Sequence, residues 1–223
     1  MSYEGTLTEL IFDVLLASYK SSSGSRSSKR TDQLHQGFMD IVSRSIDIEE
    51  SEEYNILHEQ TTKTDEDSQD TFNIDVLLQG KSYDVALLFK LIASSYNKNR
   101  NNYRDTTIGE RFRFLANNFA GRRKLAHINI LPRYAPIFDK YGSLKSVEKV
   151  NPQNIEKWDN YFNFPNKPIE AKLFFEIDKS ILDQCENRYN LYERMVEAGP
   201  GCITTWDEEQ FLNKVMDFIK DEN

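Results

Sequence analysis

Long apolar runs are missing from this sequence. No stretch approaches 18 consecutive apolar residues, and the opening MSYEGTLTEL lacks the basic start and long apolar core of a secretory signal. These absences argue against a helical membrane protein and predict a soluble, intracellular one.

Cysteine and histidine are scarce. The two cysteines, Cys185 and Cys202, fit neither a disulfide framework nor a CxxC metal clip. The three histidines, His35, His58 and His127, are too scattered to predict a zinc site. Any catalytic metal is therefore expected to have oxygen ligands.

Proline is absent from the first 131 residues, and all six prolines lie at or beyond Pro132. This change predicts regular elements before that point and an irregular, loop-rich segment after it. A chain of 223 residues is long enough for one substantial core. We therefore predict a single domain over residues 1–223, made of a helical region 1–50, a core 54–131 and an irregular region 132–223.

The charge is unevenly distributed. The chain has 28 basic and 36 acidic residues, a net charge of −8, which at first argues against a polyanionic partner. However, residues 47–70 hold ten acids and one lysine, whereas residues 95–145 hold eleven basic residues and three acids. An acidic chain of this kind can still present a cationic cleft.

Two interrupted apolar runs dominate the middle of the chain. Residues 72–78 and 83–93 are apolar and joined by a short turn at residues 79–82, which predicts a β-hairpin in the middle of a sheet. Asp75 lies inside the first run and Lys90 inside the second. Burying either side chain is costly unless it is compensated, so these two residues are the first functional candidates.

An aspartate on one strand and a lysine on the next, spaced as Asp75 and Lys90 are, resembles the active site of the PD-(D/E)XK nucleases. The resemblance covers about residues 54–131. The polar stretch and the helix expected after the lysine strand are similar to those of type II restriction endonucleases. The resemblance implies a Mg²⁺-dependent, site-specific endonuclease that hydrolyses double-stranded DNA to leave 5′-phosphates. It also implies a homodimer in the cytoplasm of a prokaryotic cell.

The same resemblance assigns roles to individual residues. Asp75 and a second acid are expected to bind Mg²⁺, and Lys90 to position or deprotonate the attacking water. Leu88 stands where the family normally has its second acid. In some type II enzymes that acid comes from the following helix, which makes Glu110 the expected replacement. The implied catalytic residues are Asp75, Lys90 and Glu110, and the implied metal ligands are Asp75, Glu110 and Phe89.

Two further acids are held in reserve, Asp84 and Glu59. Asp84 shares the strand face of Lys90 but lies far from it along the strand, and Glu59 is more simply explained as a surface carboxylate. The Asn-rich stretch at residues 94–103 is expected to be a cationic loop that contacts DNA. Its candidate DNA-binding residues are Ser95, Asn97, Lys98, Asn99, Arg100 and Asn102.

Periodicity and turn residues predict the remaining elements. Helices are expected at residues 5–19, 32–46, 106–119, 180–198 and 206–220, and further strands at 54–58, 125–131 and 172–177. A flexible loop is expected at residues 21–30, whose basic residues can reach a phosphate backbone. The helix at 106–119 should bury Ile108, Phe112, Leu115 and Phe119. The fold class is α/β (α+β), with a central mixed β-sheet flanked by helices as in restriction endonucleases.

Other functions stay open at this point. The chain can be a repair or junction-resolving nuclease on the same core. Leu88 makes a catalytically inactive DNA-binding module credible. An acidic α+β interaction protein without a nucleic-acid role is the third alternative. Aromatic residues beyond Pro132 can stack on bases, although core packing explains them more simply. They are Tyr134, Phe138, Tyr141, Trp158, Tyr161, Phe162 and Phe164.

Overall fold

The computed structural model describes residues 2–20, 28–45, 54–63, 71–80, 83–116, 123–151 and 168–220. Its helices are α1 (Leu7–Lys20), α2 (Ser28–Ser45), α3 (Tyr96–Ala116), α5 (Lys179–Asp183), α6 (Arg188–Ala198) and α7 (Glu208–Lys220). Its strands are β1 (Asn55–Lys63), β2 (Thr71–Gln79), β3 (Asp84–Leu91), β4 (Arg123–Pro132), β5 (Tyr134–Phe138), β6 (Leu144–Lys149), β7 (Ile169–Ile177) and β8 (Ile203–Trp206).

Six strands form one mixed sheet in the order β1-β2-β3-β4-β7-β8. The pairs β1/β2, β2/β3 and β7/β8 are antiparallel, whereas β3/β4 and β4/β7 are parallel. The parallel pair β3/β4 requires a crossover, and α3 makes it. The predicted mixed sheet, its central hairpin and the order strand-strand-helix-strand are confirmed.

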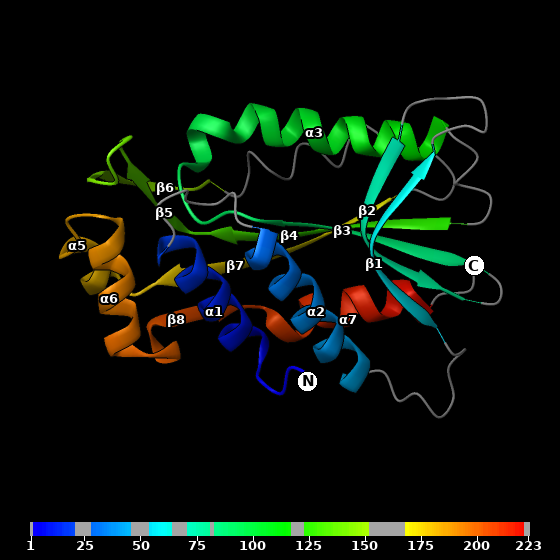
Figure 1. Cartoon of the computed structure of the whole chain (residues 1–223), viewed down its shortest axis with the longest axis horizontal. Coiled ribbons are helices and arrows are strands. Elements are labelled where there is room, and N and C mark those ends of the chain that lie inside the picture. The colour runs from blue at the N-terminus through cyan, green and yellow to red at the C-terminus, as the bar shows by residue number, and fades with distance from the viewer. Residues whose placement is uncertain are drawn as a thin grey trace.

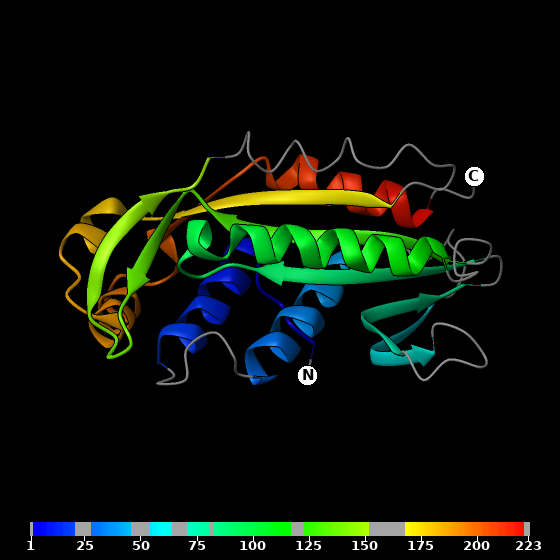
Figure 2. The same cartoon turned by 90° about the horizontal axis from the view of Figure 1, so that it is seen from above.

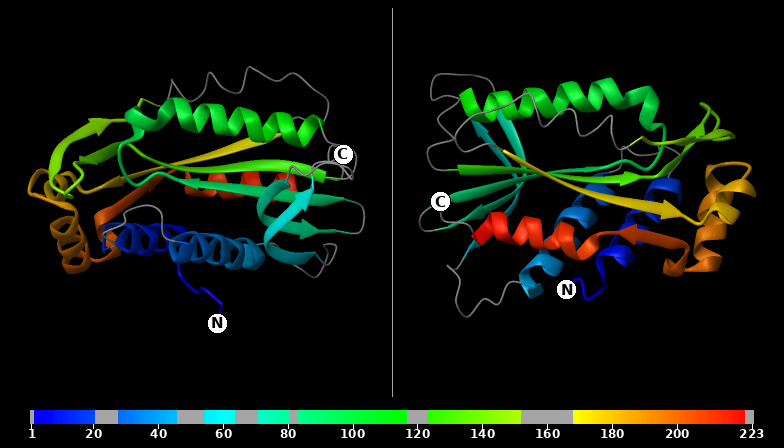
Figure 3. Two further views of the ribbon diagram at one scale, coloured as in Figure 1. Left: turned by 45° about the horizontal axis from the view of Figure 1, so that its top comes forward. Right: turned by 180° about the vertical axis from the view of Figure 1, so that it is seen from behind.

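Helices cover both faces of the sheet (Figures 1 and 2). α3 lies on one face, and α1, α2 and α7 lie on the other. The larger core cluster joins Leu10 of α1, Phe38 of α2 and Val215 of α7 to alternate residues of β2, β3, β4 and β7. A smaller cluster beneath α3 contains Phe114 and Leu88. Figure 3 shows the same layers from two further directions.

Helix α3 differs from the expectation. The stretch at residues 94–103, predicted to be a loop, is mostly its first half, because the helix begins at Tyr96 and runs for 21 residues. Asn has only a modestly low helix propensity and Lys is a good helix former, so packing of Tyr96 and Tyr103 against the sheet can stabilise a helix here.

The predicted inward face of this helix is wrong at Phe112, whereas Ile108 is half-buried. Phe112 is 64% exposed, whereas Thr107, Arg111 and Phe114 are buried. Because the buried face of α3 is partly polar, the spacing of apolar residues alone does not identify it. Phe119 and the expected end of the helix lie outside the described residues, and the burial of Leu115 is not described either.

The region after Pro132 is more regular than predicted. β4 extends to Pro132, and β5 and β6 form an antiparallel hairpin where only loops were expected. The helix expected at residues 180–198 is two helices, α5 and α6, interrupted near Cys185. Residues 21–27 of the expected flexible loop, together with Trp158, Tyr161, Phe162 and Phe164, lie outside the described residues.

No helix in the described ranges is long and apolar enough to cross a membrane.

Candidate active site

The two central strands separate partway along their length. β2 and β3 are paired only from Val76 opposite Leu87 to Gln79 opposite Asp84, although both strands continue beyond these residues. Asp75 is the first residue of β2 past the last pair. Backbone groups of β3 lose their ladder partners there and need others. The separation therefore creates a polar position in the interior of the sheet.

Asp75 fills that position. Its carboxylate accepts a hydrogen bond of 2.7 Å from the backbone N–H of Phe89, and its side chain is 31% exposed. Burial raises the pKa of Asp75 to about 6, while the Phe89 N–H and the charge of Lys90 act in the opposite direction. Asp75 is thus more than a water-facing edge residue. The contact with Phe89 uses its N–H, and the expected metal-binding role of Phe89 stays a prediction.

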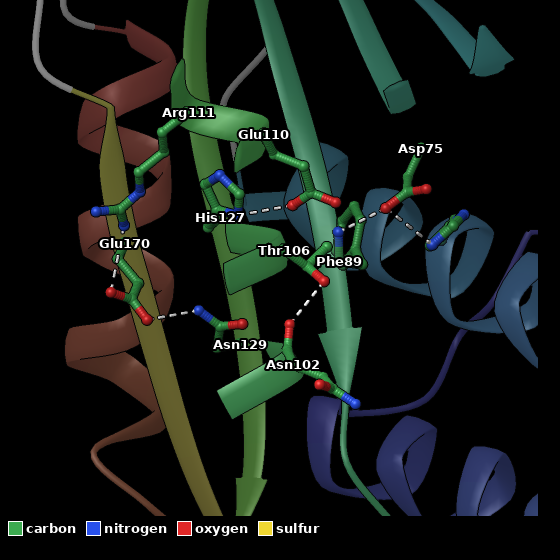
Figure 4. A network of polar contacts seen from close by, with 10 residues as sticks. Asp75, Phe89, Asn102, Thr106, Glu110, Arg111, His127, Asn129 and Glu170 are labelled. Carbon is green, nitrogen blue, oxygen red and sulfur yellow. Dashed lines mark hydrogen bonds and ion pairs between the residues drawn. The ribbon is translucent and has the colours of Figure 1, made fainter. Parts of the chain in front are cut away.

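Lys90 and Glu110 approach from the α3 side. Lys90 alternates with Leu88 on β3 and places its Nζ 5.8 Å from the ring centre of Tyr103 on α3. Burial raises the pKa of Glu110, the charge of Lys90 lowers it, and the charge of Asp75 raises it further. The charge of Lys90 therefore acts on both carboxylates, and the charge of Asp75 also acts on Glu110. Figure 4 shows Glu110 turned from α3 toward Asp75 and Phe89.

A buried polar layer holds α3 in register beside this group (Figure 4). Arg111 of α3 is paired with Glu170 of β7 at 3.3 Å, with both side chains at most 1% exposed. Asn129 of β4 donates to the other oxygen of Glu170 at 2.7 Å, and Lys172 adds a contact of 3.3 Å. Breaking a buried pair of this kind is strongly unfavourable, so the layer fixes which side of α3 faces the sheet.

His127 belongs to the same layer. Its Nδ1 lies 3.7 Å from Glu110 Oε2, too far for a hydrogen bond. Burial lowers the pKa of His127 well below its usual range, with the charges of Arg111 and Lys90 acting in the same direction. A neutral imidazole therefore packs behind Glu110. His127 is buried, and its Nε2 has no hydrogen-bond partner within the described part of the chain.

The other carboxylates play no comparable part. Leu88 is buried in the small cluster under α3 and cannot bind a metal. Asp84 lies at the opposite end of β3 from Lys90 and is paired with Arg123 at 3.2 Å. Glu59 is exposed on β1, opposite Asp75 in the ladder, and its charge adds to the raised pKa of Asp75.

Glu59 nevertheless has an unusual backbone. Its φ is +50°, a left-handed conformation that costs about 1–3 kcal/mol for a non-glycine residue. A hydrogen bond to the Asp32 carboxyl raises the pKa of Glu59. The strained residue of β1 is thus joined to helix α2 beside the separation of the strands.

Helix α2 supplies residues that the sequence analysis did not assign to the site. His35 is 1% exposed, and its Nε2 lies 3.8 Å from Asp75 Oδ2. Burial lowers the pKa of His35 to about 4, so the imidazole is neutral near pH 7. Neither of its ring nitrogens has a hydrogen-bond partner within the described part of the chain. The available signal was a histidine inside the apolar face of the predicted helix, between Leu34 and Phe38.

A pocket of about 300 Å³ opens where the strands separate. Thr31 and His35 of α2 line one side, Lys90 and Ser94 line the strand end, and Tyr103 of α3 closes the other side. Lys90 therefore lines the pocket, together with Phe89, whose N–H binds Asp75, whereas Asp75 and Glu110 are not lining residues.

The six expected DNA-binding residues lie at the start of α3. Asn97, Lys98, Arg100 and Asn102 are exposed, whereas Asn99 is half-buried and donates its amide to the Ser95 carbonyl at 3.1 Å. Ser95 itself has a φ of +53° at the sharp turn from β3 into α3. The exposed side chains form a polar, cationic surface, while Asn99 is engaged in fixing the turn.

The donor set suits a water-rich cation site better than a fully protein-bound one. Among the described residues, no group of three or more His, Cys, Asp or Glu side chains is placed to hold a metal ion. Asp75 and Glu110 are two half-buried carboxylates, and the charge of Asp75 raises the pKa of Glu110. Mg²⁺ is commonly held by one or two carboxylates with water and phosphate oxygens, so these residues fit it.

No protein-family model, curated protein or solved structure significantly matches this chain.

Proposed function

We propose that this protein is a Mg²⁺-dependent, site-specific endonuclease of the type II restriction kind, on a PD-(D/E)XK core. One observation carries the proposal. Asp75, Lys90 and Glu110 come from two separating strands and the crossover helix, yet their charges interact at one point beside a pocket. Perturbed carboxylates gathered in this way are typical of catalytic sites.

The protein groups divide the work of phosphodiester hydrolysis. Asp75 and Glu110 would hold the cation, which supplies charge neutralisation at the phosphate and an activated water. Lys90 Nζ donates to the scissile phosphate or to the water and so orients the attack. The N–H of Phe89 fixes one oxygen of Asp75 and leaves the other available. The bond between phosphorus and the 3′ oxygen breaks, which leaves the phosphate on the 5′ end.

The exposed face of α3 supports binding to a polyanion. Lys98, Arg100 and Arg113 are exposed there, and Arg104 is half-buried beside the single exposed acid, Asp105. Lys and Arg on such a surface contact phosphates, while Asn102 and Asn97 offer amide groups for base edges. The N-terminal half of the helix therefore is the proposed DNA contact.

The proposal is tested by plasmid cleavage in Mg²⁺ and in EDTA. We expect Mg²⁺-dependent cleavage by the native chain, and a loss of at least about 10²- to 10⁴-fold in the rate for Lys90→Met and Glu110→Gln. Asp84→Asn is the matched control, because this acid lies at the far end of β3, and it should cleave normally. Binding in Ca²⁺ should persist in all three variants.

Two results would contradict the proposal. Full activity of Glu110→Gln would remove Glu110 from the site. Sequence-specific binding without cleavage under any divalent cation would support the inactive DNA-binding module, for which the buried Leu88 is the reason.

A further inference from the structure

The hairpin of β5 and β6 ends in a tightly ordered tip. The carboxylate of Asp139 accepts hydrogen bonds from the backbone N–H groups of Tyr141 and Ser143, at 2.8 and 3.0 Å. The N–H of Asp139 donates to the Ser143 carbonyl, and Gly142 adopts a φ of +90° that suits glycine. The tip is therefore a fixed structure, with its backbone bonded internally.

Neighbouring elements hold the hairpin at both ends. At the tip, the N–H of Arg188 on α6 donates to the Gly142 carbonyl at 2.8 Å. At the base, the N–H of Ser95 donates to the Pro136 carbonyl, and the N–H of Asn97 donates to Glu148 at 2.9 Å. The hairpin is thus attached directly to the start of α3, where the proposed DNA-binding residues lie. Figures 1 and 2 show it beside that end of α3.

Tyr141 stands out at this tip because its side chain is 81% exposed. The other two described aromatic residues of the hairpin, Tyr134 and Phe138, are half-buried and pack against the core. Packing therefore explains those two rings and leaves Tyr141 unexplained. A rigid turn that exposes a tyrosine ring can bind a partner without first having to become ordered.

The charge around the ring indicates the kind of partner. Lys140 Nζ lies 4.7 Å from the centre of the Tyr141 ring, and Lys145 and Lys149 are also exposed on the hairpin. Its two acids, Asp139 and Glu148, accept hydrogen bonds from backbone N–H groups. An aromatic ring among lysines matches stacked bases flanked by phosphates.

We propose that the β5–β6 tip is a DNA-contacting wedge, in which Tyr141 stacks on a base of a locally distorted duplex while Lys140 and Lys145 contact phosphates. This inference rests on the proposed DNA binding and deepens it. It adds a second DNA contact, on the hairpin that adjoins the start of α3. Unstacking a base costs a few kcal/mol and is cheapest at a mismatch, so the wedge should prefer duplexes that contain one.

The test measures binding in EDTA, so that cleavage plays no part. Fluorescence anisotropy is recorded with a 30-base-pair duplex and with the same duplex carrying one central mismatch. The native chain should bind the mismatched duplex more tightly. Tyr141→Ala should weaken that complex by about 5- to 150-fold and abolish the preference, while Tyr141→Phe should retain both.

Two further variants separate stacking from charge. The double variant Lys140→Ala/Lys145→Ala should weaken binding to both duplexes and reduce the salt slope by about two. Lys220→Ala is the matched control, and it should change neither affinity. Lys220 is the exposed last residue of α7, and this end of α7 lies far from the β5–β6 hairpin (Figure 1). All these side chains are exposed, so melting temperatures should stay close to that of the native chain.

Failure of the wedge and failure of the nuclease give different results. If the native chain cleaves DNA but Tyr141→Ala binds both duplexes with the same affinities as the native chain, only the wedge proposal is overturned. A Tyr141→Phe variant as weak as Tyr141→Ala would overturn stacking. If the native chain shows the tyrosine-dependent preference without cleavage in Mg²⁺, the wedge stands and the nuclease falls. If it binds neither duplex, both proposals fall.

Discussion

The charged form of Asp75 is needed for the proposed catalysis, but it lowers the stability of the fold. Its folded-state pKa of about 6 lies above the ordinary value for aspartate because the carboxylate is buried. Between about pH 4 and pH 6 the folded state holds a proton that the unfolded state has released. Stability therefore falls as the pH rises through this window, and the full penalty remains at pH 7. The Phe89 N–H and the charge of Lys90 offset this penalty only in part, and a bound cation would offset more of it.

Asp75→Asn should therefore stabilise the metal-free protein while it abolishes cleavage. The amide oxygen can still accept from the Phe89 N–H, so only the buried charge is lost. We expect a gain of about 1–2 kcal/mol at pH 7, because water screens part of the penalty for a side chain that is 31% exposed. Urea unfolding in EDTA at pH 7 and at pH 4 measures it, and the gain should vanish at pH 4.

Asp84→Asn provides the comparison. Because the charge of Asp84 is paired with Arg123, removing that charge should not increase the stability of the fold. Adding Mg²⁺ should raise the melting temperature of the native chain and leave that of Asp75→Asn unchanged. A native chain insensitive to Mg²⁺ would argue against a cation at Asp75.

Helix α3 is the element that combines the buried and exposed halves of the proposed site. Its inner face carries Glu110 and Arg111, and its outer face carries Lys98 and Asn102. Lys98→Ala should weaken binding to all DNA sequences and reduce the salt slope by about one. Asn102→Ala should instead reduce the preference for the cognate site over random DNA. Titrations at several salt concentrations distinguish these outcomes, and equal losses on both DNAs for Asn102→Ala would exclude base readout.

Two helical glycines should respond to alanine in opposite directions. A Cβ at Gly109 on α3 meets no atom within 4 Å, so Gly109→Ala should stabilise the fold by about 0.5–1 kcal/mol. A Cβ at Gly37 on α2 would lie 2.5 Å from Leu10 Cδ1, so Gly37→Ala should destabilise it. Thermal unfolding of the pair tests whether α1 and α2 pack as closely as described. A stabilising Gly37→Ala would contradict that packing.

Sequence patterns predicted elements better than they predicted faces. The hairpin was recognisable because the apolar runs around Asp75 and Lys90 are long and the turn at Gly80 is short. A position for Glu110 near this pair was expected from the resemblance to type II enzymes, some of which take the second acid from the following helix. The inner face of α3 was not recognisable, because its stripe includes Thr107 and Arg111, whose burial depends on Glu170 from a distant strand. The proximity of His35 to Asp75 likewise depends on how α2 packs against the sheet.

At the scale of the whole molecule, the proposed function predicts an assembly of two chains. A two-fold symmetric enzyme reads a two-fold symmetric site, so a type II enzyme of this kind is expected to be a homodimer. Sedimentation velocity should give twice the chain mass of 26.1 kDa, at least with cognate DNA. A monomer on DNA that nicks one strand at a time would favour a repair or junction-resolving role.

The partial pairing of β2 and β3 also has a mechanical consequence. The β1–β2 arm is joined to the rest of the sheet by only four residue pairs, whereas β3 and β4 share eight. Bending at this short seam would break few hydrogen bonds, so it is the natural hinge of the sheet. Asp75 lies beside the hinge, while Lys90 and Glu110 lie on the stationary side. A swing of the arm would change the gap between the carboxylates, and with it the fit of any cation held there.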